Sequence, residues 1–285
     1  MQEASEVAPE APPPVAGLAP PPALGVLLVA WLFAGLLLAF ILLPLLQLVA
    51  TPSLASLRRA AGDTDIASAL GLSLIGAALA ALLSATIGVP LAYLLARTRF
   101  PGRATVAAIA DLPLCVPHTV AGIALLMVFG RRGLVGRPAE ALFGLQFWGS
   151  LAGVVVAMAF VAVPYMVNAA RIGFEAVDPR LEKVARTLGM GPWEVLLRIT
   201  LPLAAHGIAT GFALTFARAI SEFGAVVILA YYPMTAPVRI YELFLRFGLD
   251  DAVAAAVLLL ALSLALFVLF RHFVQRVAPM PGIGR

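Results

Sequence analysis

The sequence predicts an all-α polytopic membrane protein with six transmembrane helices. Of its 285 residues, 62% are hydrophobic and 12% are charged, whereas soluble domains average about 45 to 50% apolar and about 25% charged residues. The mean hydropathy is +1.02. The hydrophobic residues gather in segments that are each near or above the about 20 residues a helix needs to cross a bilayer. These segments cover residues 24–50, 67–96, 105–130, 147–170, 201–230 and 252–270.

The composition argues against several other functions. A single cysteine, Cys115, cannot form an internal disulfide framework, and three scattered histidines without Cys-x-x-Cys spacing do not make a zinc site. The net charge is +4, but the arginines are spread over short loops and form no basic stripe with interleaved aromatic residues. We therefore expect the lipid bilayer as a partner, no nucleic acid, and no metal bound by this chain.

The N-terminal region divides into a polar tail and a first helix. Residues 1–23 are rich in Pro and Ala and contain acidic residues without Lys or Arg, so we expect a disordered tail. Residues 24–50 are apolar for long enough to span a bilayer and lack an evident signal-peptide cleavage site. We expect them to be retained as the first transmembrane helix, followed by a core domain over residues 60–275.

The distribution of Lys and Arg predicts the orientation, because these residues accumulate on the cytoplasmic side. An even number of spans places both termini on one side. The loops on that side hold more Lys and Arg, which predicts that both termini, including the 276–285 tail, and the 172–200 loop are cytoplasmic. The predicted cytoplasmic set is Arg97, Arg99, Arg103, Arg171, Arg180, Lys183, Arg186, Arg198, Arg271, Arg276 and Arg285, against Arg58, Arg59, Arg131, Arg132, Arg137, Arg239 and Arg246 outside.

The third apolar segment, 105–130, is interrupted by ionisable residues and prolines. Asp111 and His118 lie within it, and Pro113 and Pro117 each remove a helical hydrogen bond. Non-helical backbone within a membrane has to be buried in protein or line a wet cavity. Two interpretations are open: a broken helix beside a transport route, or an interfacial helix followed by a span that begins at His118.

The fifth segment carries Arg218 and Glu222, four residues apart on one helix face. Pairing offsets the cost of roughly 2.5 to 3.5 kcal/mol for a lone Arg at the membrane centre. Such a pair either borders a route for an anion or ties two helices together, and the pairing itself favours the structural alternative. Asn168 is expected to form a helix–helix hydrogen bond. The candidate pathway residues are Asp111, Pro117, His118, Thr119, Arg218, Ser221 and Glu222.

A polar stretch, residues 175–202, separates the fourth and fifth segments. Asp178 and Pro179 are typical of the N-cap and first position of a helix, and Gly189 of its C-terminal end. Pro192 then opens a second short helix. The first helix is amphipathic, which favours insertion into a groove on a partner over a helix lying flat on the bilayer. Its apolar stripe is Leu181, Val184, Ala185 and Leu188, and its polar residues are Arg180, Glu182, Lys183 and Arg186.

This stretch resembles the permease subunits of binding-protein-dependent ABC importers. Their cytoplasmic signature is Glu-Ala-Ala, three residues, Gly, nine residues and Ile-x-Leu-Pro. Here Ala185, Gly189 and the run that ends at Pro202 match, whereas Lys183 replaces the leading Glu and the following Val replaces the first Ala. Two alternatives are open for the leading Glu of the signature. Either Glu182, the residue directly before Lys183, takes over its acidic role, or the contact made by that Glu is absent here.

Two further runs, 112–122 and 216–237, look like the molybdate/tungstate permeases, and the first is also similar to the related sulfate permeases. The resemblance covers nearly everything after about residue 60. It implies a MetI-like bundle with a cytoplasmic coupling-helix loop in a prokaryotic cytoplasmic membrane. It also implies a homodimer, two ABC ATPase subunits and an extracytoplasmic oxyanion-binding protein. The expected ATPase-coupling residues are Glu182, Lys183, Ala185, Leu188, Gly189, Pro192 and Trp193.

The function expected from this resemblance is import of a tetrahedral oxyanion, molybdate or tungstate, by alternating access. A sulfate/thiosulfate permease is the alternative. ATP and Mg²⁺ are expected on the ATPases and no cofactor on this chain, which has no Gly-x-x-x-x-Gly-Lys motif. An intramembrane enzyme would need Ser221 and His118 to converge, yet no Gly-x-Ser-x-Gly motif surrounds Ser221, and we expect no catalytic residue. A passive channel would not need a structured cytoplasmic loop.

Overall fold

The computed structural model describes residues 24–277, and every regular element in this range is a helix. The chain divides into two units, Met1–Ala50 and Thr51–Arg285. The tail predicted at residues 1–23 lies outside the described residues, as does the predicted C-terminal tail from residue 278 onward.

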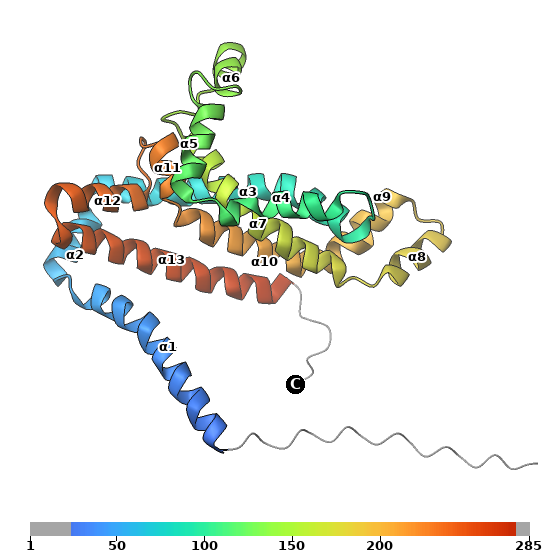
Figure 1. The fold of residues 1–285 in the computed structure, drawn as a ribbon, viewed down its shortest axis with the longest axis horizontal. Helices are drawn as coiled ribbons and strands as arrows, with labels where there is room; N and C mark the ends of the chain where they lie inside the picture. The colour runs from blue at the N-terminus through green and yellow to red at the C-terminus, as the bar shows by residue number, and fades with distance from the viewer. Residues whose placement is uncertain (1–23, 278–285) are drawn as a thin grey trace, which may run out of the picture. The chain divides into compact units, whose positions relative to one another are not determined.

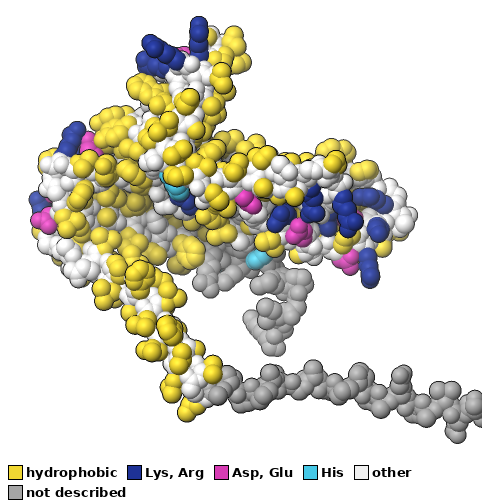
Figure 2. Space-filling model, viewed as in Figure 1, with side chains coloured by type: hydrophobic (Ala, Val, Ile, Leu, Met, Phe, Trp, Pro, Cys, Tyr) yellow, Lys and Arg dark blue, Asp and Glu magenta, His cyan; other side chains and the backbone are white. Residues whose placement is uncertain are grey.

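The first unit contains α1, Leu24–Ala50, at the position predicted for the first transmembrane helix. None of its residues is buried, and hydrophobic side chains lie all along it (Figure 2). A helix that is apolar all round is expected in lipid or against another membrane protein.

The second unit is built around four long helices, α3, α7, α10 and α13, which lie side by side (Figure 1). At one end of this bundle lie α2 and α12, and at the other end lie α8 and α9. The helices in chain order are α2 Leu54–Gly62, α3 Thr64–Arg97, α4 Arg103–Cys115, α5 His118–Phe129, α6 Gly136–Phe143, α7 Leu151–Glu175, α8 Pro179–Thr187, α9 Pro192–Val195, the π-helical turn η1 Leu196–Thr200, α10 Leu201–Ile220, α11 Gly224–Leu229, α12 Ala236–Phe247 and α13 Leu249–Val277.

Among the described residues, five helical segments are long and apolar enough to cross a membrane, and the α4–α5 pair makes six if it is counted as one bent span. This agrees with the predicted membrane bundle. Residues 105–130 are broken into α4 and α5, which are bent by 112° at Val116 and Pro117. This confirms the predicted break, and the position of α4 relative to the bilayer stays a prediction. With 13 and 12 residues, neither half reaches the about 20 residues that a span of its own needs.

The predicted fifth span, 201–230, is wrong at its C-terminal end. It stops at Ile220, and α11 begins only at Gly224. The reason is Glu222, whose Oε1 accepts a hydrogen bond from the Ala225 N–H at 2.9 Å and so caps the next helix instead of continuing the first. Hydropathy stays high across the break and does not reveal it.

Small residues set the distance between the long helices. The face of α3 that meets α7 is lined by alanine, glycine and serine, including Gly76, Ala80 and Ser84, all buried. The α7–α10 contact is closest at Gly173 and Gly207, where a Cβ built on Gly207 lies 2.5 Å from the Gly173 Cα. The two helices therefore meet backbone to backbone at this point.

Gly207→Ala is expected to lower the free energy of unfolding by about 1 to 3 kcal/mol, because the new methyl group meets main-chain atoms that cannot move aside. The measurement is thermal unfolding of the purified protein in detergent. Gly71→Ala on α3 is the matched control, since a Cβ there has nothing within 4 Å. Equal stability of the two variants would contradict the close approach.

Candidate functional site

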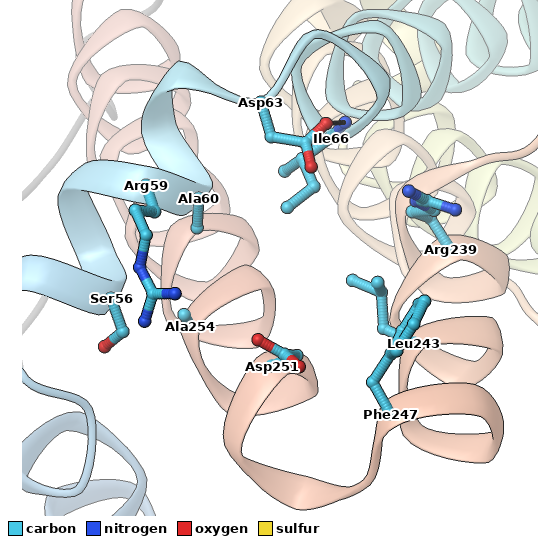
Figure 3. A pocket seen from close by; sticks show the side chains of 10 residues that line it. All are labelled: Ser56, Arg59, Ala60, Asp63, Ile66, Arg239, Leu243, Phe247, Asp251 and Ala254. Atoms are coloured by element: carbon cyan, nitrogen blue, oxygen red, sulfur yellow. Dashed lines mark hydrogen bonds between the residues drawn. The ribbon is translucent and has the colours of Figure 1, made fainter.

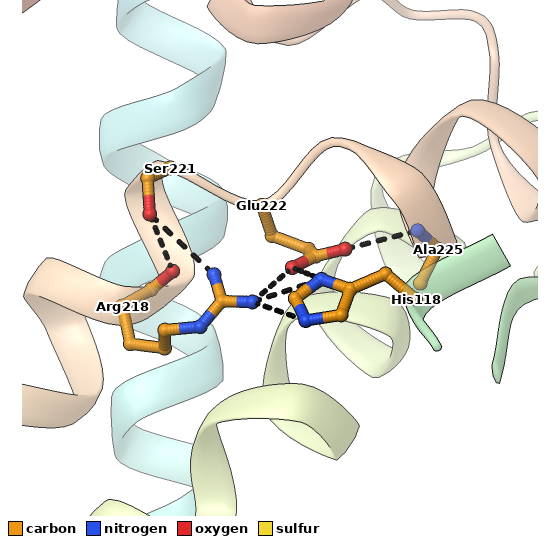
Figure 4. A network of polar contacts seen from close by, with 5 residues as sticks. All are labelled: His118, Arg218, Ser221, Glu222 and Ala225. Carbon is orange, nitrogen blue, oxygen red and sulfur yellow. Dashed lines mark hydrogen bonds and ion pairs between the residues drawn. The ribbon is translucent and has the colours of Figure 1, made fainter. Parts of the chain in front are cut away.

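Three polar side chains meet where α5, α10 and α11 approach one another (Figure 4). Arg218 lies in the last turn of α10, Glu222 follows in the break before α11, and His118 is the first residue of α5. Arg218 Nη2 donates to Glu222 Oε2 at 2.8 Å, and His118 Nδ1 lies 2.8 Å from the same oxygen. The predicted pairing of Arg218 with Glu222 is therefore confirmed, and His118, distant in sequence, joins it.

Arg218 Nη2 also lies close to both ring nitrogens of His118, at 2.9 Å from Nδ1 and 3.0 Å from Nε2. The imidazole ring therefore lies against the guanidinium group and the Glu222 carboxylate together. Because Glu222 Oε1 is used by the Ala225 N–H, both carboxylate oxygens have donors.

The side chains of this network differ in exposure. The Glu222 side chain is 1% exposed, whereas those of Arg218 and His118 are 20% and 43% exposed. Arg218 Nη1 donates to Ser221 Oγ at a long 3.4 Å, and Ser221 is exposed. Donors that reach the surface while a buried carboxylate neutralises them can contact an anion without holding it tightly.

A close helix approach brings His118 to this position. A Cβ on Gly224 would lie 2.6 Å from the Cβ of His118, so only glycine lets the start of α11 approach the start of α5 this closely. Pro117 precedes α5 at the bend, and both Pro117 and Thr119 are exposed beside the network.

Asp111, predicted with the same group, has a different partner. Asn168 Nδ2 donates to Asp111 Oδ1 at 2.7 Å and links α7 to α4, which confirms the helix–helix bond predicted for Asn168. Ser221 Oγ donates to the Arg218 carbonyl at 3.0 Å. Within the described network Ser221 makes no hydrogen bond to His118, so the Ser–His pair that an enzyme would need is not formed.

The second candidate site is the region of α8 and α9. Here α8 ends in a Schellman motif, in which the Gly189 N–H bonds the Arg186 carbonyl at 3.0 Å and the Met190 N–H bonds the Ala185 carbonyl at 3.1 Å. Gly189 has a φ of +92°, a conformation that favours glycine. The predicted helix end at Gly189 is therefore confirmed, and the turn after it has a defined direction.

The predicted N-cap is also present, since Asp178 Oδ1 accepts from the Arg180 N–H at 2.8 Å. The predicted second short helix differs from the prediction. It begins at Pro192 but continues through η1 into α10 as one helical segment of 29 residues, Pro192–Ile220. The segment that begins at Pro192 is therefore continuous with a helix long enough to span the membrane.

The structure separates the predicted coupling residues into an exposed and a buried group. Leu188 and Trp193 are 80% and 74% exposed, so both side chains lie on the surface of this region. Glu182 and Ala185 are buried and face the bundle, so the assignment of Glu182 to the polar outer face and of Ala185 to the apolar contact stripe was wrong. The exposed predicted residues are Lys183, Leu188, Gly189, Pro192 and Trp193.

A cavity of about 360 Å³ lies at the other end of the bundle (Figure 3). Two arginines and two aspartates line it, Arg59, Asp63, Arg239 and Asp251. Asp63 is occupied in capping α3, and Arg239 pairs with Glu242 at 2.7 Å. The balanced charges and these existing bonds favour a structural role over selection of an anion.

Comparison with known proteins gives the family. Residues 88–279 match the model of the binding-protein-dependent transport system inner membrane component. The chain belongs to this family. This permease is 43% identical to the molybdate/tungstate transport system permease protein WtpB of Thermococcus kodakarensis, over 86% of this chain and 96% of that protein. It is 40% identical to the molybdenum transport system permease protein ModB of Escherichia coli, over 61% of this chain and 77% of that protein.

Solved structures share the fold of the permease at low sequence identity. A bacterial alginate ABC transporter in complex with its alginate pentasaccharide-bound periplasmic protein has a TM-score of 0.71 and 17% identity, with 89% of this chain and 95% of that chain covered. The inward-facing methionine ABC transporter has a TM-score of 0.60 and 17% identity, with 75% and 96% covered. The fold is the predicted MetI-like bundle of ABC importers.

Proposed function

We propose that this permease carries molybdate or tungstate across the cytoplasmic membrane as the transmembrane subunit of an ATP-driven importer. The choice of substrate rests on the 43% identity to a molybdate/tungstate permease, which is matched over 96% of that protein's length. Sulfate or thiosulfate is less favoured, because the relatives named above are molybdate/tungstate and molybdenum permeases.

In this proposal a second copy, two ATPase subunits and an extracytoplasmic binding protein complete the transporter. The α8 and α9 end faces the cytoplasm in this proposal, because Lys and Arg side chains gather over that end (Figure 2). The distribution of Lys and Arg along the sequence supports the same side for both termini. The exposed Leu188 and Trp193 offer an apolar surface that fits a groove on an ATPase. ATP and Mg²⁺ bind to that partner.

The route for the anion is proposed to pass the two helix breaks, at residues 116–117 and 221–223. Support comes from the exposure of Arg218, His118 and Ser221 at these breaks, while Glu222 stays buried. Weak contacts suit transport, since a tight site would slow release. ATPase closure would rock the bundles as near-rigid bodies and open this route alternately to each side.

The substrate proposal is tested by calorimetric titration of the cognate binding protein with molybdate, tungstate and sulfate, combined with ATP-driven uptake in vesicles that contain the permease and its ATPase. Molybdate or tungstate is expected to bind at least about a hundredfold more tightly than sulfate, a difference of roughly 2.7 kcal/mol. Tight sulfate binding without tungstate binding would overturn the choice of substrate.

A further inference from the structure

A buried ion pair joins the end of α3 to α8. Arg97 is the last residue of α3, and its Nη2 lies 3.0 Å from Glu182 Oε1, with the two side chains 11% and 10% exposed. The same Nη2 donates to the Val177 carbonyl at 2.8 Å. Arg97 therefore holds both the chain that enters α8 and the first turn of that helix.

Glu182 is bound from a second side. Thr200 Oγ1 donates to Glu182 Oε1 at 3.0 Å, and Thr200 is fully buried. Thr200 ends η1, the π-helical turn in which the Leu201 N–H bonds the Leu196 carbonyl. Such turns insert an extra residue into a helix and are frequent at functional sites. One carboxylate oxygen thus connects α3, α8 and the helix that runs from α9 into α10.

Other ion pairs at this end of the bundle are more exposed than this one. Arg103 and Glu175 lie 3.8 Å apart with side chains 42% and 45% exposed, and Arg198 and Glu194 are exposed further still. Exposed pairs contribute little. A buried pair is costly to form, and an apolar pair of similar volume often serves stability equally well. Stability alone therefore gives little reason for Arg97 and Glu182 to be charged.

We propose that Arg97, Glu182 and Thr200 form a coupling link, a set of positioning residues that makes α8 move together with α3 and α10. The inference rests on the proposed role of α8 as the ATPase contact. When the ATPase displaces the exposed face of α8, Glu182 on its inner face passes the displacement to both helices through short, directed bonds. Without the link, α8 can tilt while the membrane-spanning helices stay in place.

The test uses the complete transporter in proteoliposomes and measures molybdate taken up per ATP hydrolysed, together with thermal stability. Glu182→Leu leaves the buried Arg97 without a counter-charge and is expected to lower both stability and uptake. The double variant R97M/E182L removes both charges and is expected to regain most of the stability. It is nevertheless expected to transport at least about fivefold less molybdate per ATP than the parent, the lower end of usual coupling between sites.

The ratio of molybdate to ATP separates coupling from structure. If the pair only stabilises the fold, the double variant regains the parental ratio together with its stability, and the inference is wrong while the proposed function stands. Arg97→Lys keeps the charge. This variant is expected to take up more molybdate per ATP than the double variant and less than the parent. Arg103→Gln removes a charge from an exposed pair at the same end and is expected to leave the ratio unchanged. A parent transporter that takes up neither molybdate nor tungstate would instead overturn the proposed function, and the inference with it.

Discussion

Replacing Glu222 by leucine is expected to lower the free energy of unfolding by about 3 to 5 kcal/mol, because removing one partner of a buried ion pair leaves the other charge uncompensated. The Glu222 side chain is 1% exposed, and its oxygens take hydrogen bonds from Arg218 and the Ala225 N–H. The leucine variant therefore loses a helix cap as well as a charge. The measurement is titration of the purified protein from a mild detergent into SDS, followed by circular dichroism.

The double variant R218M/E222L decides whether this network also contacts the anion. It leaves no unpaired charge, so most of the lost stability is expected to return. ATP-driven uptake is nevertheless expected to be lost, since Arg218 is the charged side chain that borders the proposed route. Recovery of uptake together with stability would mean that the pair only ties helices.

A buried pair elsewhere in the protein provides the matched control for this experiment. Glu242 on α12 is 3% exposed and pairs with Arg239 at 2.7 Å and with Arg246 at 3.0 Å, both on its own helix. R239M/E242L is expected to keep uptake. Loss of uptake in this control would show that the assay reports damage to the fold and not contact with the anion.

Composition and hydropathy predicted the membrane bundle because burial in lipid requires long apolar segments, and such segments are visible in any window of sequence. They could not predict where a span ends when both sides of the break are apolar. The end of α10 at Ile220 depends on a side chain, that of Glu222, which turns inward and caps α11. The break at Pro117 was predicted, because proline acts on its own local backbone.

In the candidate sites, too, contacts between residues close in the sequence could be predicted, whereas contacts between distant residues could not. Arg218 and Glu222 are four residues apart, so their pairing was predicted from spacing. The predicted shared helix face was wrong, because α10 ends at Ile220 and Glu222 lies in the break after it. His118 joins them only because α5 packs against α11, which no local pattern indicates. For α8, the amphipathic rule assumes an apolar inner face. It failed at Glu182 because Arg97, far away in sequence, supplies the counter-charge that makes a buried carboxylate acceptable.

Gly189→Val is expected to slow ATP-driven uptake about tenfold or more. The φ of +92° at Gly189 is one that a residue with a side chain adopts only at a cost of about 1 to 3 kcal/mol. The chain can relieve this strain by opening the Schellman motif and turning α8 away from α9. Each 1.4 kcal/mol of strain that opening the motif relieves lowers the population with the correct α8 direction about tenfold.

Gly191 provides the matched control, because it lies in the same turn with an ordinary φ of −69° and nothing within 4 Å of a built Cβ. Gly191→Val adds the same bulk to the same surface and is expected to leave uptake near the parental rate. Gly189→Asn should fall between the two, since asparagine tolerates positive φ better than valine does. Equal uptake by Gly189→Val and Gly191→Val would contradict a requirement for the left-handed turn. A difference between them would assign the effect to the direction in which Gly189 sends the chain from α8 to α9, because the backbone conformation is what distinguishes the two positions.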